Sequence, residues 1–192
     1  MTGVNLVDPP SSMNYASVVI SDSESLASLI YALNNLYFLA GDIQDAYLKY
    51  PTKEKVFFCA GNEWKFYQGK VVVIVRALYG FKSSALEWRN HLSKIIGNHL
   101  VLQSSLADPD YRFKAATDKT GNEYYTYILV YVDNLPIVEK YPLKYMAMLE
   151  SKYTVKLSSI GYPKVYIGAD VGKLLYGDGS YVWRMKSDSY VK

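Results

Sequence analysis

The sequence has few of the residues that build disulfides and soft-metal sites. Among its 192 residues are one cysteine, Cys59, and two histidines, His91 and His99. A single cysteine excludes an internal disulfide and a cysteine-based zinc site. The two histidines are too few and too isolated to form a metal centre, and we interpret each as a residue of a surface or a helix face.

Long apolar runs and an N-terminal basic segment are lacking too. No apolar run approaches the roughly 18 residues of a membrane span, and the first twenty residues contain no Lys or Arg. The sequence therefore predicts no membrane partner and no secretory signal, and an intracellular location in the cytoplasm or the nucleus. Half of the residues are hydrophobic, which is enough for one domain with a sizeable core and an attached subdomain.

The net charge is low, at +3, but the charges are unevenly distributed. Residues 63–94 include six basic residues against two acidic ones, interleaved with aromatic residues. Basic groups neutralise phosphates and rings stack on bases, so this segment fits a nucleic-acid contact surface. The alternative is a solvated face with ordinary core aromatics. The basic residues are Lys65, Lys70, Arg76, Lys82, Arg89 and Lys94.

Apolar residues at helical spacing predict three helices, over about 22–35, from Ser84 to about 100, and over 143–153. Two serine and glutamate pairs have the spacing of a capping box at the starts of the first two helices. These pairs are Ser21 with Glu24 and Ser84 with Glu87. Residues 1–20 lack periodicity and predict an extended lead-in, whereas 187–192 resemble the start of another helix.

Short apolar runs between turn residues predict strands. One run ends on Asp42, and "KVFFCAG" with "KVVVIVRAL" predicts a small hairpin. Another strand pair folds about Asp133 and Asn134, and a last one turns within Gly-Asp-Gly-Ser at 177–180. Strands separated by helices predict an α+β fold in which an antiparallel sheet is backed by helices.

Asp42 and Asp133 each lie at the end or the tip of apolar strands, where a side chain can project from a sheet edge. Two carboxylates brought together repel each other unless a divalent cation neutralises them, and Mg²⁺ favours such oxygen ligands. In two-metal phosphoryl transfer one ion activates the attacking hydroxyl and the other stabilises the leaving pyrophosphate. The alternative is that Asp133 and Asn134 are only a two-residue hairpin turn, which both residue types tolerate.

Four motifs occur in a fixed order along the chain: "GDIQDAYL" at 41–48, "RALYGFKSSALEW" at 76–88, "LADPDYR" at 106–112 and "YILVYVDN" at 127–134. Together they resemble the reverse transcriptase domain of copia-type retrotransposons, over nearly the whole chain from about Tyr15 to Lys192. The resemblance implies a polymerase palm within 21–186, with partial fingers at about 49–77 and the start of a thumb at 187–192. It also implies RNA-directed DNA polymerase activity with Mg²⁺ or Mn²⁺.

The resemblance implies a role for particular positions. Asp42 and Asp133 match the metal-binding and catalytic aspartates, and Ile43 beside Asp42 belongs to the implied metal site. If so, Asp42 and Asp133 must lie on neighbouring strands of one sheet, with Asn134 at the same hairpin tip. The implied nucleotide-binding residues are Asp45, Ala46, Tyr47, Tyr79, Gly80 and Lys82. Core packing is the alternative role for Tyr47 and Tyr79 in a chain with 20 tyrosines.

Two departures from the family pattern weaken the implied activity. Asn134 replaces a catalytic aspartate, so one negative charge is lost, and Pro136 removes a backbone N–H from the return strand. The family's basic finger segment, thumb and RNase H domain are expected outside this chain, in a longer polyprotein. The sequence therefore predicts a fragment that takes an RNA or DNA template-primer and a dNTP, with weak or no activity. The alternative is a noncatalytic relic that binds nucleic acid or another partner.

Overall fold

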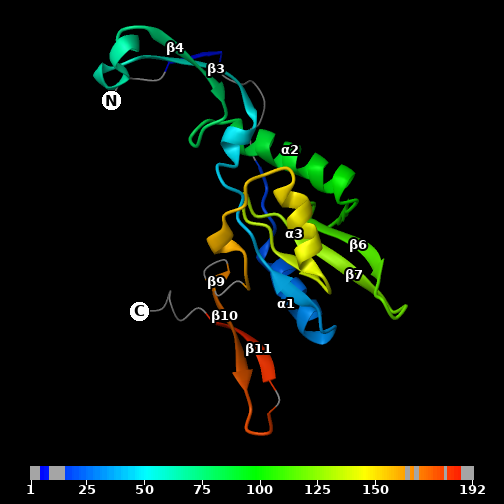
Figure 1. The fold of residues 1–192 in the computed structure, drawn as a ribbon. Helices are drawn as coiled ribbons and strands as arrows, with labels where there is room; N and C mark the ends of the chain where they lie inside the picture. The colour runs from blue at the N-terminus through cyan, green and yellow to red at the C-terminus, as the bar shows by residue number, and fades with distance from the viewer. Residues whose placement is uncertain (1–4, 9–15, 163–164, 167–168, 180, 187–192) are drawn as a thin grey trace. The chain divides into compact units, whose positions relative to one another are not determined.

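The computed structural model describes residues 5–8, 16–162, 165–166, 169–179 and 181–186. The chain forms two compact units. The first contains the described residues before Val18 together with Asp45–Ile95, and the second contains Val18–Gln44 and the described residues from Ile96 onward. The fold class is α+β, as predicted, with an antiparallel sheet backed by helices (Figure 1).

The first unit is built on a three-stranded antiparallel sheet in the order β1-β3-β4. The predicted hairpin is confirmed, because β3 and β4 pair along most of their length. β1 pairs with β3, so part of the predicted lead-in is a strand. The elements are β1 (Asn5–Asp8), η1 (Tyr47–Lys49), β3 (Pro51–Cys59), η2 (Asn62–Tyr67), β4 (Val71–Arg76) and α2 (Ser84–His99), whose last residues belong to the second unit.

The second unit contains a five-stranded antiparallel sheet in the order β2-β8-β7-β6-β5. Its strands are β2 (Tyr37–Leu39), β5 (Gln103–Ser104), β6 (Tyr111–Thr117), β7 (Glu123–Leu129) and β8 (Ile137–Glu139). No sequence pattern predicted β6. That strand carries Lys114 and two alanines rather than an apolar run, and its seven-residue pairing with β7 stabilises it instead.

Helices cover both faces of this sheet. α1 (Ser21–Leu33) contributes Ala27 and Tyr31 to a buried cluster that includes Phe38 and Val138 of the sheet. α3 (Pro142–Glu150) packs against β2 and β8. Its Tyr145 hydroxyl lies 3.5 Å from the buried Thr126 hydroxyl. Alternation along the strands explains this arrangement, because successive residues project to opposite faces.

The first predicted capping box is wrong. Ile20 is the N-cap residue of α1, and no side chain caps the helix. Ser21 is already helical, and the Glu24 N–H donates to the Ile20 carbonyl at 3.2 Å. The Glu24 side chain is 3% exposed. The interior of the unit, rather than the helix terminus, therefore determines where this carboxyl lies.

The second predicted capping box is displaced by one residue. The Glu87 N–H donates to the Ser83 carbonyl at 3.0 Å, so Ser83 occupies the cap position. Both the N–H and the hydroxyl of Ser83 donate to the buried Glu54 carboxylate, at 2.6 and 2.7 Å. Glu87 pairs with Lys53 at 2.7 Å instead of reaching back to the cap. A buried acceptor on β3 thus fixes Ser83 at the cap position, one residue before the serine of the predicted capping box.

The remaining elements of the second unit follow α3 in the chain. They are η3 (Leu157–Ser159), β9 (Val165–Tyr166), β10 (Ala169–Leu175) and β11 (Tyr181–Lys186). β10 and β11 pair antiparallel, which confirms the last predicted hairpin. The helix start predicted at 187–192 lies outside the described residues. No helix in the described ranges is both long and apolar enough to cross a membrane.

Candidate functional site

The strands β2 and β8 stay paired beyond their regular ends, and this brings the two aspartate positions together. The Leu135 N–H donates to the Gly41 carbonyl at 2.9 Å, and the Ile43 N–H donates to the Asp133 carbonyl at 2.8 Å. Asp42 is the bridge partner of Asn134 between these two bonds. The expected proximity of Asp42 to the hairpin tip is therefore present in the second unit.

The hairpin turn differs by one residue from the predicted one. Tyr131 and Asn134 exchange two backbone hydrogen bonds, of 3.0 and 2.9 Å, so the turn residues are Val132 and Asp133. Val132 has a φ of 55°. A β-branched residue rarely adopts that conformation, which costs on the order of 1–3 kcal/mol. The turn therefore holds Asp133 at its tip at the expense of strain in its neighbour.

Asn134 is the residue directly opposite Asp42. Directly opposed residues of an antiparallel pair project to the same face, with Cβ atoms roughly 4.5–5.5 Å apart. A neutral amide rather than a carboxylate therefore accompanies Asp42. Pro136 accepts a bond from the Leu129 N–H at 2.9 Å but has no N–H to return, so the predicted loss of a ladder bond is confirmed. The strands keep their pairing on both sides of it.

Lys156, which no sequence motif indicated, contacts Asp42. Lys156 Nζ lies 2.5 Å from Asp42 Oδ1, and the two side chains are 46% and 27% exposed. The backbone fixes this pair, because the Lys156 N–H donates to the Asp42 carbonyl at 2.9 Å. The Asp42 N–H donates to the Ser159 hydroxyl, also at 2.9 Å and 117 positions away. No local pattern could have indicated contacts over that separation.

Close packing beneath Asp42 explains the glycine that precedes it. A Cβ at Gly41 would lie 2.6 Å from the Met146 methyl carbon and 3.2 Å from a Val155 methyl carbon. The neighbouring Ile43 is 1% exposed, so its apolar side chain belongs to the core. Ile43 can therefore contribute only its backbone to a metal site. The glycine allows the strand to approach α3 closely enough to hold Asp42 in place.

The oxygen donors fit a hard divalent cation, although the Lys156 ammonium already pairs with the Asp42 carboxylate. The carboxylates of Asp42 and Asp133, the Asn134 amide and the Ile43 carbonyl are oxygen donors of the kind that Mg²⁺ prefers. Within the described ranges, no three His, Cys, Asp or Glu side chains are grouped closely enough to hold a metal ion. A divalent ion at Asp42 would have to share its carboxylate with the Lys156 ammonium or displace that group.

The predicted nucleotide residues belong to the first unit. Ala46 is buried and Tyr47 is 9% exposed, whereas Tyr79 is 66% exposed. The two tyrosine rings lie 4.3 Å apart between centroids, at an angle of 39°. Core packing therefore describes Tyr47 but not Tyr79. Asp45 is exposed with a φ of 54°, which is unusual for a residue other than glycine.

The turn after Tyr79 uses the conformational freedom of glycine. Gly80 has a φ of 97°, a value that an L side chain rarely adopts. Lys82 follows it and is exposed. Ser83, directly before α2, is then held by its bonds to Glu54. The exposed tyrosine, the glycine and the lysine are thus presented on a short segment anchored at its C-terminal end.

The basic residues proposed to contact nucleic acid have different surroundings. Lys65 in η2 and Arg76 at the end of β4 are exposed, whereas Arg89 on α2 is partly buried. Lys70 Nζ lies 4.6 Å from the centre of the Phe66 ring, which is 80% exposed. Exposed rings beside exposed cations support the contact-surface interpretation at 64–76. In contrast, Trp88 is 1% exposed and belongs to the core.

No protein-family model matches the chain, and neither does any curated protein sequence. The assignment to the copia-type reverse transcriptases remains a prediction that rests on the four ordered motifs.

Proposed function

We propose that the chain is a palm-and-fingers fragment of a copia-type retrotransposon reverse transcriptase, with RNA-directed DNA polymerase activity that is weak or absent. The observation that carries the proposal is the pairing of Asp42 with the Asp133 hairpin in one antiparallel sheet. Template-primer and dNTP are the proposed partners. The proposed location is the cytoplasm or the nucleus, where such templates occur.

Asp42, Asp133 and the Ile43 carbonyl would hold the divalent ions of the proposed site. When bound, two such ions supply an activated primer hydroxyl and stabilise charge on the leaving pyrophosphate. The task of the protein is to position these oxygens, and the backbone bonds at Gly41 and Ile43 do so. Within the first unit, the exposed Tyr79 ring and the Lys82 ammonium are suited to contact a base and phosphates, because rings stack and ammonium groups attract phosphate.

Two features support weak activity. Asn134 presents an amide where a third carboxylate would strengthen the field around the ions. Lys156 places an ammonium 2.5 Å from Asp42. Phosphoryl transfer depends chiefly on positioning and electrostatic stabilisation. Losing one well-placed group commonly costs about 3–4 kcal/mol of transition-state stabilisation, which is a factor of about 10² to 10³ in rate.

The metal site can be tested separately from catalysis. We expect Mn²⁺ to raise the thermal midpoint of the chain, because a ligand that binds the folded state stabilises it. Asp42→Asn and Asp133→Asn should each remove that increase, whereas the control Asp22→Asn, at an exposed position of α1, should keep it. Equal increases in all four proteins would reject the site. Primer extension with Mg²⁺ and Mn²⁺ completes the test, and robust extension would contradict the proposed weak activity.

A noncatalytic nucleic-acid-binding relic is the second candidate function. The exposed Lys65, Lys70 and Arg76 near exposed rings favour it, since these groups need no metal site to bind a strand. Affinity for a labelled RNA–DNA hybrid should then fall with salt, by about 0.7–0.9 log units per phosphate contact for each log unit of salt. Asp42→Asn should leave this binding unchanged. Binding that does not respond to salt would exclude this candidate.

A further inference from the structure

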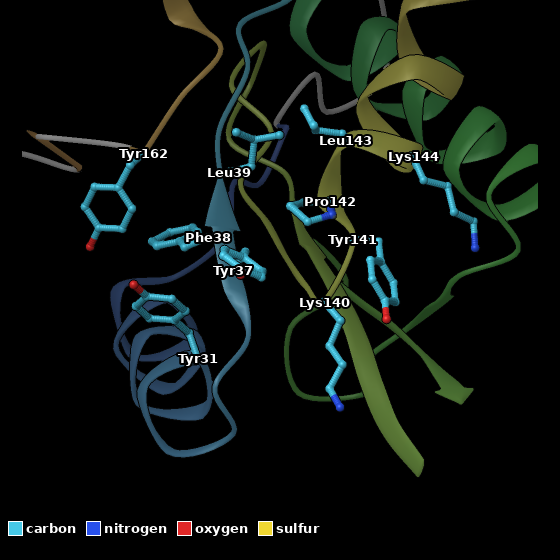
Figure 2. A pocket seen from close by; sticks show the side chains of 10 residues that line it. All are labelled: Tyr31, Tyr37, Phe38, Leu39, Lys140, Tyr141, Pro142, Leu143, Lys144 and Tyr162. Atoms are coloured by element: carbon cyan, nitrogen blue, oxygen red, sulfur yellow. The ribbon is translucent and has the colours of Figure 1, made fainter. Parts of the chain in front are cut away.

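The two units have open surfaces of different kinds. In the second unit, a cavity of about 570 Å³ has an almost wholly apolar lining. The rings of Tyr31, Phe38 and Tyr162 form one wall, and the ammonium groups of Lys140 and Lys144 point away from it (Figure 2). In the first unit, the strand β4 combines exposed apolar side chains with backbone groups and charges at one sheet edge. The cavity therefore offers apolar area without a charge, whereas the edge of β4 offers directional contacts.

We propose that the edge of β4 binds an extended protein segment with acidic ends, which adds a strand to the sheet of the first unit. The strand order is β1-β3-β4, so β4 has a neighbouring strand on one side only among the described residues (Figure 1). An edge strand presents a row of unpaired N–H and C=O groups, and extended peptides add to such edges through main-chain hydrogen bonds. With six residues, β4 is long enough to guide such a segment.

The register of the β3–β4 hairpin determines which backbone groups of β4 point outward. The Ala60 N–H donates to the Lys70 carbonyl at 2.9 Å, so the backbone of Lys70 is directed toward β3. The pairing then continues without a shift from Val71 to Ile74. Because residues of an antiparallel strand alternate in the direction of their N–H and C=O groups, Val71 and Val73 direct theirs away from β3. These are the groups that an added strand would pair with.

Exposed valines follow the same strand. Val71, Val73 and Val75 are 67%, 63% and 67% exposed, whereas Val72 and Ile74 are partly buried. Directly opposed residues of paired strands project to the same face, so apolar side chains of an added strand would cover these valines. A hollow of about 500 Å³ beside Val73 and Val75 leaves room for such a side chain. Valines do not stack on bases, and this row therefore favours a protein strand over a nucleic acid.

Cations at both ends of the valine row favour acidic ends on the partner. Lys70 directly precedes β4 and Arg76 ends it. Both side chains are exposed, and neither has a carboxylate partner in the part of the chain that the structure describes. A second copy of β4, paired antiparallel about Val73, would place Lys70 of each copy opposite Arg76 of the other. Like charges directly opposite are destabilising, so charge complementarity favours an acidic partner over a second copy.

Two labelled peptides test the charge requirement. In Glu-Val-Thr-Val-Thr-Val-Glu, an antiparallel register centred on Val73 pairs valines with the exposed valines of β4 and carboxylates with Lys70 and Arg76. Titration of the full chain, followed by fluorescence anisotropy, should give saturable binding at one site. The same peptide with lysine ends should bind about tenfold more weakly, because two exposed charge pairs change from attraction to repulsion. Equal affinity of the two peptides would overturn the proposal.

A proline variant tests the backbone contacts. Val73→Pro removes an outward N–H and no bond to β3, a position at which an edge strand tolerates proline. We expect at least about a tenfold loss of affinity for the acidic peptide, whereas the matched variant Val73→Thr, which keeps the N–H and the branched side chain, should change it by less than about threefold. If Val73→Pro lowers the thermal midpoint, the peptide is modified instead. N-methylation of its central valine should weaken binding, and N-methylation of the adjacent threonine, whose N–H points away from β4, should not.

Three results would overturn the proposal at this stage. The first is peptide binding that neither Val73→Pro nor methylation of the central valine weakens. The second is binding of a labelled RNA–DNA hybrid that Val73→Pro weakens as much as peptide binding, which would assign the edge to nucleic acid. The third is a dimer in sedimentation that Val73→Pro dissociates and that binds no peptide, which would assign the edge to a second copy of the chain.

Discussion

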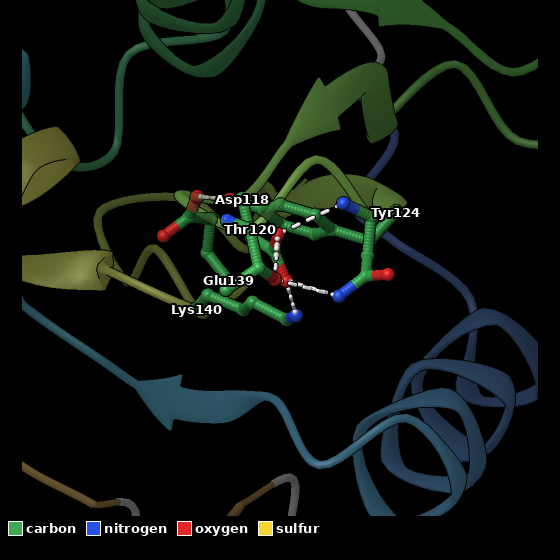
Figure 3. A network of polar contacts seen from close by, with 6 residues as sticks. Asp118, Thr120, Tyr124, Glu139 and Lys140 are labelled. Atoms are coloured by element: carbon green, nitrogen blue, oxygen red, sulfur yellow. Dashed lines mark hydrogen bonds and ion pairs between the residues drawn. The ribbon is translucent and has the colours of Figure 1, made fainter.

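Two aspartates of the second unit are each paired with a lysine at 2.5 Å, yet their surroundings differ. Asp118, in the turn between β6 and β7, accepts bonds from Thr120, Asn122 and Lys140, which leave neither oxygen without a donor (Figure 3). The Asp42 carboxylate pairs with a single side chain among the described residues, that of Lys156. A saturated carboxylate is a structural element, whereas an incompletely satisfied one can still accept a ligand.

The pKa values of Asp118 and Glu24 are shifted in opposite directions. Hydrogen bonds from Lys140, Thr120 and Asn122 hold the pKa of Asp118 well below its usual range. Glu24 represents the opposite extreme. Burial, with a smaller contribution from Asp108, raises the pKa of Glu24 to about 7. The three carboxyls therefore range from saturated, through singly paired, to buried beside another acid.

The largest loss of stability should come from removing the saturated carboxylate of Asp118. Asp118→Ala leaves the donors of Thr120, Asn122 and Lys140 without their acceptor, so the urea midpoint should fall clearly at pH 7. The matched variant Asp42→Ala should lower the free energy of unfolding by less than about 1 kcal/mol, because exposed ion pairs contribute little. Equal losses would show that saturation does not distinguish the two sites.

The Asp118 comparison also has a pH dependence. The folded-state pKa of Asp118 lies below its unfolded value of 3.8. Its contribution is therefore complete above pH 4 and is lost as the pH falls further, while the unfolded state binds the extra proton. The difference in urea midpoint between the unmodified chain and Asp118→Ala should shrink below pH 4. A difference that stays constant would contradict the assignment.

Sequence patterns predicted the helices and hairpins better than they predicted these side-chain contacts, for a physical reason. Helices and hairpins arise from spacing within about twenty residues, and α1, α2, α3 and the β3–β4 hairpin were all predicted. The Asp118–Lys140 pair spans 22 positions, and the Asp42–Ser159 bond spans 117. Such contacts depend on sheet register, which a single sequence does not specify.

In the candidate site, sequence-based prediction meets the same limit at the level of single residues. The motifs indicated that Asp42 and Asp133 approach each other, and the backbone brings these positions together. They did not indicate that Asn134 is directly opposite Asp42, or that the turn begins at Val132. Both details depend on a register of one residue, and a slip of one residue exchanges the two faces of a strand.

The second largest change in stability should come from replacing Glu24, and it depends on pH. The folded state keeps the Glu24 proton up to about pH 7, whereas the unfolded state releases it near 4.5. Stability should therefore fall as the pH rises from 4.5 to 7. Glu24→Gln should remove that slope, and the control Glu150→Gln, at an exposed position of α3, should keep it. A shift of one pKa unit corresponds to about 1.4 kcal/mol in the free energy of unfolding. Solvent screening reduces the expected change in that free energy between pH 4.5 and 7 to about 2 kcal/mol.

A smaller effect should follow from adding a carboxylate beside Asp42. Asn134→Asp places two acids directly opposite each other, which should lower stability by about 0.2–1 kcal/mol without metal. Mn²⁺ should reverse that loss, because an additional carboxylate strengthens the binding of a divalent ion. Urea unfolding with and without Mn²⁺ measures both effects. A gain in metal-free stability would contradict the predicted repulsion.

The smallest change in stability, and the sharpest test of the comparison, should come from removing the cation beside Asp42. Lys156→Gln breaks a half-exposed pair, so the free energy of unfolding should change by less than about 0.5 kcal/mol. The Asp42 carboxylate then has no competing ammonium, and its apparent affinity for Mn²⁺, measured by titration, should rise by about threefold to tenfold. Lys152→Gln is the control, since Lys152 is exposed and four positions earlier in the chain. If both variants bind Mn²⁺ with the affinity of the unmodified chain, Lys156 does not compete with the metal ion for the Asp42 carboxylate. Asp42 would then resemble the saturated Asp118 more than its exposure indicates.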